Sequence, residues 1–390
     1  MSVALAGLGI TEMGKVFGST PSDFAAEAIR LAVADAGLTF GDLDGLLLNP
    51  GVSHGALGIE LAAALGLRDL SLLALMNGYG SSAGAMVQTA ALAVDAGMAD
   101  TVACVFADAP VEPGRNIGWA FSGLGASQPK GFGSLAATTG IPGVAGLYGF
   151  AARRHMAAYG TNEEHFAAVA VNQRDWATSN PYAQQRTPMT VEDHHNSRWI
   201  AEPFRLFDCG LVSNGGVAVI VTSAERAADL RQPPVHLWGW GQGHPGYPME
   251  RGSEFGLTSG AVQSSRAAYT MAGITSTDID VAEIYDCFTF TVILSLEDYG
   301  FCAKGDGGPF AASGALGRGG SLPTNTGGGQ LSSFYMWGMT PLSEGVIQVR
   351  GQGGQRQVGR HDIVLVSGNG GILDHHSTLV LGAHPRNSRG

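Results

Sequence analysis

Cysteine is scarce in this chain, with four residues at positions 104, 209, 287 and 302 and no Cys-x-x-Cys pair. Structural zinc sites and disulfide frameworks normally show themselves as closely spaced, paired cysteines. The sequence therefore predicts no metal site and no cofactor in this chain. It also favours a reduced, cytoplasmic location.

Charge and long apolar runs are also sparse. Only 14% of the residues are charged, the formal net charge is -11, and no basic run occurs. Nucleic-acid binding depends on clustered Lys and Arg, so we expect no nucleic-acid partner. No apolar run approaches the ~20 residues that cross a bilayer, so we expect no membrane span. The N-terminal segment lacks the basic region of a signal peptide, and its pattern predicts a first strand.

Apolar residues and glycine are plentiful. The 390 residues are 45% hydrophobic and include 59 glycines. A chain of this length and composition can bury a large core, as two subdomains or as a duplicated one. The glycines are scattered through periodic apolar segments, which favours tight strand-helix turns and closely packed helices over low complexity.

Two segments nearly repeat each other. Residues 36–44 read Ala-Gly-Leu-Thr-Phe-Gly-Asp-Leu-Asp, and residues 272–280 read Ala-Gly-Ile-Thr-Ser-Thr-Asp-Ile-Asp. Each follows an Ala-rich stretch with helical spacing, about 22–36 and 259–272, and each precedes an apolar strand. A glycine at this place ends a helix in a left-handed conformation. The repeat predicts one strand-helix-strand unit used twice.

A second pair of similar segments, 99–105 and 361–367, follows in the same order. We therefore predict two halves, 1–225 and 232–390, each an α/β unit with a mostly parallel sheet covered on both faces. Chance similarity of common helix-glycine-strand patterns is the alternative. The segment 112–210 is richer in aromatic and polar residues, and we expect it to form a cap over the site. Its periodicity predicts helices near 144–159, 163–179 and 190–201. Its distinctive side chains are Trp119, Trp176, Tyr182, His194, His195 and Trp199.

Four motifs carry the functional information. They are Asn-Gly-Tyr-Gly-Ser-Ser-Ala-Gly at 77–84, Glu-Ile-Tyr-Asp-Cys-Phe at 283–288, the glycine-rich run at 322–335, and Ser-Gly-Asn-Gly-Gly at 367–371. In chain order they resemble the thiolase nucleophile turn, the Asn-Glu-Ala-Phe segment, the loop that presents Gly-His-Pro, and the Cys-x-Gly-Gly-Gly loop. The similarity to the thiolase superfamily extends over the whole chain.

Further marks place the resemblance in the lipid-transfer, sterol-carrier branch: Tyr159-Gly, Asn180-Pro, 200–203 and 208–216. The resemblance implies a duplicated five-layered α/β/α/β/α fold with a helical cap insert. It also implies a homodimer and acyl-CoA substrates, with no cofactor in this chain beyond the coenzyme A of the substrate.

The reactive groups of thiolases are missing from these motifs. Gly80 stands at the nucleophilic cysteine, Tyr335 at the histidine, and Ser367 at the second cysteine. Glycine offers no nucleophile, so a covalent acyl-enzyme at this position is excluded. Ser81 or Ser82 could substitute, but no base is visible near them, and the plainer interpretation is that both cap the following helix.

Tyr285 takes the place of the asparagine in the second motif, so two tyrosines should meet in one pocket. A phenol has a pKa near 10, and it donates and accepts protons without a permanent charge. We predict that Tyr285 and Tyr335 are catalytic, in a retro-aldol cleavage of a β-hydroxyacyl thioester that needs no enzyme nucleophile. The predicted oxyanion and substrate-binding positions are Gly80, Asn325, Ser367, Gly368, Gly370 and Gly371.

At a finer level the chain resembles the steroid side-chain-cleaving aldolases of actinobacteria. The motifs that carry this lie at 284–292, 296–302, 307–310 and 325–332. The resemblance implies cleavage of a β-hydroxy steroid acyl-CoA to propionyl-CoA and a steroid ketone or aldehyde. It also implies a small zinc-ribbon and OB-fold accessory protein, with zinc only in that partner.

Other polar residues near these motifs are weaker candidates. Cys287 should point away from the tyrosine face and pack in the core. Asp286 either orients a phenol or faces the neighbouring loop. The pair Glu297 and Asp298 is expected on a solvated helical face.

Four histidines also remain as weaker candidates. His244 lies in a Gly-His-Pro tripeptide, but the glycine-rich turn that precedes this tripeptide in thiolases is absent, so a loop residue is expected. His54, His375 and His376 either border the pocket or are ordinary loop residues.

Two other functions stay open. One is a thiolase or acyltransferase with an atypical nucleophile, which would become acylated during turnover. The other is a catalytically silent lipid- or acyl-CoA-binding subunit that supports a partner.

Overall fold

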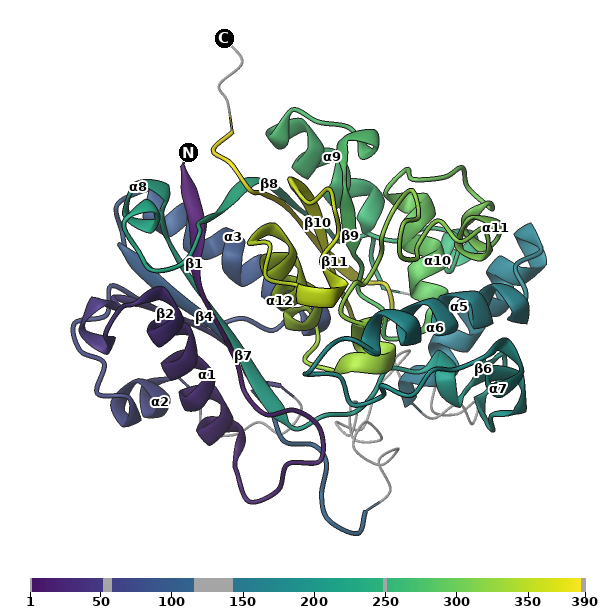
Figure 1. The fold of residues 1–390 in the computed structure, drawn as a ribbon, viewed down its shortest axis with the longest axis horizontal. Coiled ribbons are helices and arrows are strands. Elements are labelled where there is room, and N and C mark those ends of the chain that lie inside the picture. The colour runs from purple at the N-terminus through teal and green to yellow at the C-terminus, as the bar shows by residue number, and fades with distance from the viewer. Residues whose placement is uncertain (1, 52–57, 116–142, 248–250, 387–390) are drawn as a thin grey trace.

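The computed structural model describes residues 2–51, 58–115, 143–247 and 251–386 (Figure 1). His54 and Trp119 lie outside these residues. Both halves begin with the same strand-helix-strand unit. In the first half it is β1 (Val3–Ile10), α1 (Pro21–Ala36) and β2 (Gly45–Asn49). In the second half it is β8 (Val235–Gly243), α9 (Ala261–Ala272) and β9 (Val281–Glu283).

The repeated nine-residue segment is one turn built twice. Gly37 and Gly273 end α1 and α9 in the left-handed conformation, with φ of 77° and 65°. In the first turn, Asp42 then accepts the backbone N–H of Thr39 at 2.8 Å. In the second turn, Asp278 accepts that of Thr275 at the same distance. The similarity of sequence therefore encodes a shared hydrogen-bonded turn.

The described strands form a nine-stranded sheet in the order β3-β2-β4-β7-β1-β8-β11-β10-β9. The remaining strands of this sheet are β3 (Leu72–Leu75), β4 (Thr101–Asp108), β7 (Gly215–Ser223), β10 (Ile363–Gly370) and β11 (His375–Gly382). The first five positions come from the first half, and the last four come from the second. The two groups join through a short antiparallel register of Ala4 with His236 and Leu5 with Val235. A parallel bridge from Ala282 to Thr324 adds a fifth position to the second group, equivalent to β3.

The expectation of a mostly parallel sheet was wrong. Among the described strands, β2 pairs in parallel with β3 and β4, and so do β9 and β10. The pairings of β1 with β7 and β8, of β4 with β7, and of β11 with β8 and β10 are antiparallel. The reason is that β10 and β11 are joined by a short turn, and β4 and β7 by the long insert. Neither connection is the helical crossover that a parallel pair requires.

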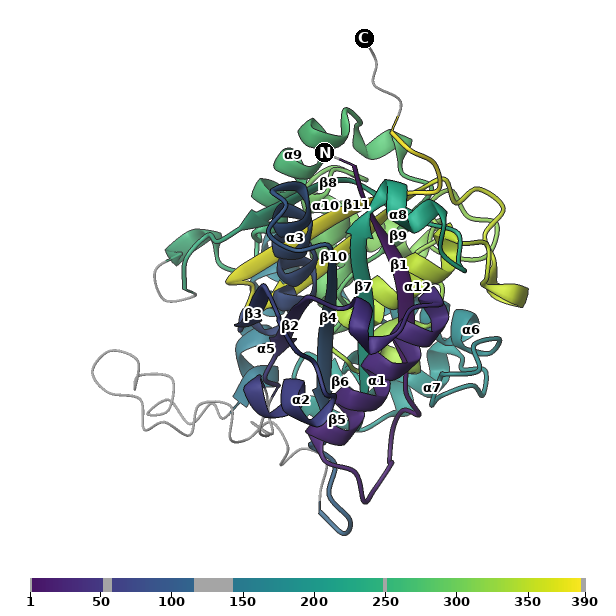
Figure 2. The same cartoon turned by 90° about the vertical axis from the view of Figure 1, so that its left-hand side faces the viewer.

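Two helices occupy the centre of the molecule. Helix α3 (Ser82–Asp95) packs against β4 and β7 and also against β10 and β11, and α12 (Met339–Val349) contacts strands of both groups. All eleven residues of α12 are buried, as expected for a helix that is enclosed on every side. Helix α1 covers the outer face of the first group and α9 that of the second (Figures 1 and 2). The five-layered α/β/α/β/α prediction is confirmed.

The insert contributes α5 (Gly143–Tyr159), α6 (Glu163–Ala177), α7 (Val191–Asn196) and the hairpin β5 (Trp199–Ala201) and β6 (Phe204–Arg205). These elements gather on one side of the molecule, beside α10 (Thr289–Asp298) and α11 (Gly307–Ala312) (Figure 1). The helix predicted over 190–201 ends at Asn196, because the residues that follow turn back into the hairpin. Two further short α-helices in the described part of the chain are α2 (Ile59–Ala64) and α8 (Ala224–Ala228).

The prediction that Glu297 and Asp298 face solvent was wrong. Both side chains are fully buried at the end of α10, where Lys304 pairs with each of them. His155 from the insert adds a contact of 3.0 Å to Glu297, and the Ser259 N–H donates to Asp298 at 2.7 Å. The sequence pattern around the two acids does not show these partners, which come from distant segments. Throughout the described ranges, each helix is too short or too polar to cross a bilayer.

Candidate active site

The two predicted tyrosines meet. Tyr285 lies two residues after the end of β9, and Tyr335 lies two residues after the end of the π-helical turn η8 (Gly329–Ser333). Their hydroxyl oxygens are 3.1 Å apart, within hydrogen-bond distance, and their rings pack edge to face. Tyr285 is 4% exposed, whereas Tyr335 keeps partial exposure. The convergence of the two motifs is therefore present in the fold.

Both phenols are neutral at rest. Burial raises the pKa of Tyr285 and of Tyr335 above the ordinary value, and the nearby Cys287 thiol adds to the effect in each case. Between the two, their mutual hydrogen bond lowers the pKa of Tyr335 and raises that of Tyr285. Burial makes the ionised form of either phenol unfavourable in free energy. Because the two hydroxyl groups are in contact, a proton can still move from one oxygen to the other.

Gly80 is required by the ring of Tyr285. A Cβ atom built at Gly80 would overlap the Cε2 and Cζ atoms of Tyr285 and the backbone oxygen of Asn369. The phenol ring therefore fills the space that a side chain at position 80 would need. The loss of the nucleophile and the gain of the tyrosine are two aspects of one packing arrangement.

The glycine-rich end of β10 packs against the turn that contains Gly80. A Cβ atom at Gly368 would press on the Gly80 carbonyl oxygen and on Ser81, and one at Gly370 would overlap the Gly78 carbonyl oxygen. Backbone thus lies directly on backbone, a contact that only glycine allows. Gly371 has a left-handed φ of 64° and starts the turn into β11.

Ser367 lies apart from this group. It occupies the opposite face of β10, where its hydroxyl is 3.2 Å from His376 Nε2 and close to Tyr299. His376 is 1% exposed and sits in β11 rather than in a loop, and burial lowers its pKa to about 3. The structure therefore brings Gly80, Gly368 and Gly370 to the tyrosine pair, but it directs the Ser367 hydroxyl into a separate buried cluster.

Asn325 ties its loop to the segment that carries Tyr285. The residue has a left-handed φ of 51°, and its Oδ1 accepts the Ile284 N–H at 2.6 Å. Its Nδ2 is buried without a hydrogen-bond partner among the described residues. A cavity of about 10 Å³, the size of one water, is lined by Asn325, Asp286, Glu283 and Glu344.

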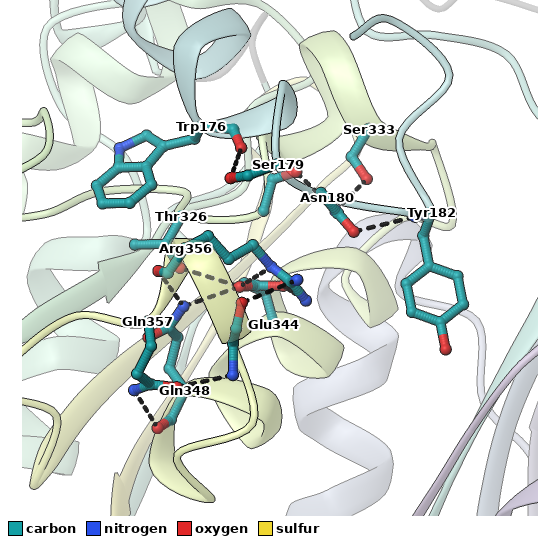
Figure 3. A network of polar contacts seen from close by, with 12 residues as sticks. Trp176, Ser179, Asn180, Tyr182, Thr326, Ser333, Glu344, Gln348, Arg356 and Gln357 are labelled. Carbon is teal, nitrogen blue, oxygen red and sulfur yellow. Dashed lines mark hydrogen bonds and ion pairs between the residues drawn. The ribbon is translucent and has the colours of Figure 1, made fainter.

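A network of hydrogen bonds and an ion pair holds the loop that contains Asn325 (Figure 3). Thr326 donates through its hydroxyl to Glu283 at 2.7 Å, and Glu344 pairs with Arg356 at 2.8 Å. Burial, and then the neighbouring Glu344, raises the pKa of Glu283 to about 8. From the insert, Asn180 donates to the Gly327 carbonyl oxygen at 2.8 Å. The loop before Tyr335 is therefore fixed by both the second half and the insert.

Ser81 and Ser82 serve the turn rather than the helix. The Ser81 hydroxyl donates to the Gly78 carbonyl oxygen, and the Ser82 hydroxyl accepts the Gly78 N–H, both at 2.7 Å. The predicted capping of α3 is thus replaced by bracing of the turn η2 (Tyr79–Ser81) that precedes it. Neither hydroxyl bonds to a base among the described residues.

Tyr148 is a neighbour of the site that sequence reasoning missed. It reaches from α5, is 1% exposed, donates to the Gly371 carbonyl oxygen at 2.9 Å and accepts from Asn369 Nδ2 at 2.9 Å. Cys287 contacts it, and burial raises the pKa of that thiol to about 12, so Cys287 is a neutral core thiol. The prediction that Cys287 points away from the tyrosines was wrong, because the thiol lies near both of them. The only sequence signal for Tyr148 is an aromatic residue with a polar tip among small residues.

The structure also shows the surroundings of the other weaker candidates. Asp286 faces the η8 turn and accepts its backbone N–H groups. His244 is an exposed residue just beyond β8, with its Nδ1 2.7 Å from that of His375. Neither histidine contacts the tyrosine pair in the described structure.

Comparison with known proteins identifies relatives of this chain. The family model described as "Thiolase C-terminal domain-like" matches residues 241–383. A steroid side-chain-cleaving aldolase from Thermomonospora curvata is 37% identical over 98% of each chain. A 17-hydroxy-3-oxo-4-pregnene-20-carboxyl-CoA lyase from Mycobacterium tuberculosis is 37% identical over 94% of this chain and 96% of its own.

Solved structures agree on the fold. The Ltp2-ChsH2(DUF35) aldolase superposes with a TM-score of 0.88 at 37% identity, covering 98% of this chain and 97% of its own. Human mitochondrial 3-ketoacyl-CoA thiolase superposes with a TM-score of 0.70 at 13% identity, covering 98% and 99%, which shows the shared fold alone. The chain therefore belongs to the thiolase superfamily, in the family of the steroid side-chain-cleaving aldolases.

Proposed function

We propose that this protein is a carbon–carbon lyase that cleaves a β-hydroxyacyl-CoA by a retro-aldol reaction. The observation that carries the proposal is the Tyr285–Tyr335 pair, 3.1 Å apart, at a position where Gly80 rules out a covalent nucleophile. The names of the relatives support a steroid side-chain CoA thioester as the substrate. The products are then propionyl-CoA and a steroid ketone or aldehyde.

The tyrosine pair suits this reaction because it can relay a proton from the β-hydroxyl group to Cα. One phenol oxygen takes the proton of the β-hydroxyl while it passes its own proton to the second phenol. The electrons of the Cα–Cβ bond move into the thioester enolate, and the β-carbon becomes a carbonyl. In the same step the second phenol gives its own hydroxyl proton to the enolate at Cα, so that neither oxygen carries two protons. No proton is gained or lost overall, and no free phenolate is needed, which matches the raised pKa of both groups.

The enolate oxygen needs hydrogen-bond donors placed before the reaction begins. We place the thioester at the glycine surface formed by Gly80, Gly368, Gly370 and Gly371, with Asn325 behind it. Backbone N–H groups of these glycines are the candidate donors, as the resemblance to the thiolase motifs implies. In this proposal Ser367 supports the strand through His376 and does not touch the substrate.

We also propose that the protein works as a homodimer. Strand β3 is the edge of the sheet, and Leu73 and Leu75 on it are exposed. Exposed Tyr79 and Leu92 lie nearby in sequence, on the turn and helix that follow. An unpaired edge strand with leucines is suited to pairing with a second copy.

An accessory protein completes the proposal. The name of the related aldolase structure pairs Ltp2 with ChsH2(DUF35), and we infer a corresponding small zinc-ribbon and OB-fold partner that carries the only zinc. This chain itself would then need no cofactor. A cytoplasmic location is supported by its four cysteines, none of which forms a disulfide.

The decisive assay incubates steroid β-hydroxyacyl-CoA with the protein, with and without the accessory protein, and follows free propionyl-CoA. Mass spectrometry of the protein after turnover should show no acyl adduct. An adduct on a hydroxyl or thiol would support the acyltransferase alternative. Tight acyl-CoA binding without turnover in the complete complex would support the silent subunit.

A further inference from the structure

Asp286 is next to one proposed catalytic tyrosine in the chain and bonds to the turn that leads into the other. It is the residue directly after Tyr285, and it is 1% exposed. Its Oδ1 and Oδ2 accept the Gln330 N–H at 2.9 and 2.8 Å, and Oδ2 also accepts the Leu331 N–H at 3.2 Å. Both donors belong to η8, the turn that leads into Tyr335. One side chain therefore joins the segments of the two tyrosines.

The fit around this carboxylate is tight. Gly329 has a left-handed φ of 58°, and a Cβ atom there would overlap Asp286 Oδ2 and approach Gln173 Oε1. Gln173, from α6 of the insert, lies next to this carboxylate. The carboxylate is thus reached from its own turn, from η8 and from the insert.

The chemistry of the carboxylate matches this place. Ionised, it only accepts hydrogen bonds, and the two N–H groups of η8 point at it. Burial raises the pKa of Asp286 to about 7, although the hydrogen bonds from the Gln330 and Leu331 N–H groups act to lower it. An apolar side chain would fill this space without the free-energy cost of burying an acid. The carboxyl group is therefore better explained by its hydrogen bonds to η8 than by packing.

We propose that Asp286 is a positioning residue that sets the distance between the Tyr285 and Tyr335 hydroxyls by holding η8 against the turn after β9. The inference rests on the proposed function. A proton relay needs the two oxygens within hydrogen-bond reach, and the present 3.1 Å leaves little room. If η8 shifts away from Asp286, Tyr335 moves with it and the relay opens.

The test is Asp286→Asn, which keeps the size of the side chain but turns a donor toward the N–H groups of η8. A misplacement of about 1 Å can cost about 10²-fold in rate, so we expect kcat to fall by about that factor while KM stays within a few-fold. In a Tyr335→Phe background the same change should cost little more, because both act on one relay. Turnover in the complete complex and a crystal structure of the variant are the two readouts.

Asp298→Asn is the matched control. Asp298 is also buried in this half and accepts a backbone N–H, that of Ser259 at 2.7 Å, but it has no contact with either tyrosine segment. We expect it to lower the melting temperature about as much as Asp286→Asn does, with kcat retained. Should Asp286→Asn fail to fold, Gly329→Ala displaces the carboxylate without removing it and should give the same selective loss of kcat.

Three results would overturn the proposal. They are a kcat within a few-fold of the natural protein, a loss that multiplies fully with that of Tyr335→Phe, or an unchanged Tyr285–Tyr335 hydroxyl distance in the crystal structure of the variant. If the natural complex shows no lyase activity, the proposed function fails. The hydroxyl distance still decides whether Asp286 positions the pair.

Discussion

The steric dependence of Tyr285 on Gly80 makes the sharpest prediction. Gly80→Ala adds one methyl group where the Tyr285 ring and the Asn369 carbonyl oxygen already stand. Overpacking of a tight core typically costs about 1–3 kcal/mol, and the ring must move to relieve it. Because the Tyr335 hydroxyl is only 3.1 Å away, that movement should break the pair and reduce turnover by about 10²-fold or more.

A double-mutant cycle isolates the cause. Tyr285→Ala removes the ring but leaves the Asn369 carbonyl oxygen in place, so Gly80→Ala should cost less in that background than in the natural protein, by at most about 1–3 kcal/mol. Urea denaturation gives the free energy of unfolding for each variant. The control is Gly359→Ala, since a Cβ atom at Gly359 meets no atom within 4 Å and the residue has no unusual φ.

The same logic covers restoration of the cysteine. Gly80→Cys should be at least as destabilising as Gly80→Ala and should gain no thiolysis of 3-ketoacyl-CoA, because Tyr335 and Ser367 do not supply the missing acid and base. Natural stability and turnover in Gly80→Ala, or thiolase activity in Gly80→Cys, would refute the reasoning.

Three further predictions follow from the site and the sheet edge. Tyr285→Phe and Tyr335→Phe should each lower kcat by ~10²- to 10⁴-fold with folding and CoA binding kept, and the double variant should lose less than the product; turnover within a few-fold of natural would make both packing residues. The raised pKa of Glu283, about 8, means that its contribution to stability is fully present below its unfolded pKa and is lost as pH rises through 8. Glu283→Gln should therefore flatten the fall in urea midpoint across that range, and an unchanged slope would count against a protonated Glu283. Leu75→Lys on the exposed edge of β3 should weaken the dimer in sedimentation, whereas a stable, active monomer of the natural protein would contradict the dimer itself.

Much of the fold was predictable because local patterns encode it. The repeated glycine and aspartate turn marks the ends of α1 and α9, and the apolar run after each turn identifies a strand, β2 in the first half and β9 in the second. The convergence of Tyr285 and Tyr335 was predictable only through the motifs around them, because 50 residues separate them in the chain. The resemblance to thiolases supplied that long-range information.

The features that were missed depend on partners from distant segments. Tyr148 reaches the Gly371 turn from a helix 223 residues away, and nothing in its own helix shows the destination. The burial of Glu297 depends on His155 and Lys304, which satisfy the carboxylate where its own helix would leave it exposed. Strand direction was misjudged because sequence shows that strands alternate with other segments but not which connections cross over the sheet.

The central layer of α3 and α12 has a consequence for how the chain folds. Each of these helices is wrapped by strands from both halves, so neither half has a complete interior of its own. A fragment ending near residue 225 would leave the inner face of its strands and much of α3 in water. The two halves share a pattern of strands and helices, but we expect the whole chain to unfold cooperatively. We therefore expect a single melting transition, and we expect that neither half, 1–225 or 232–390, folds by itself.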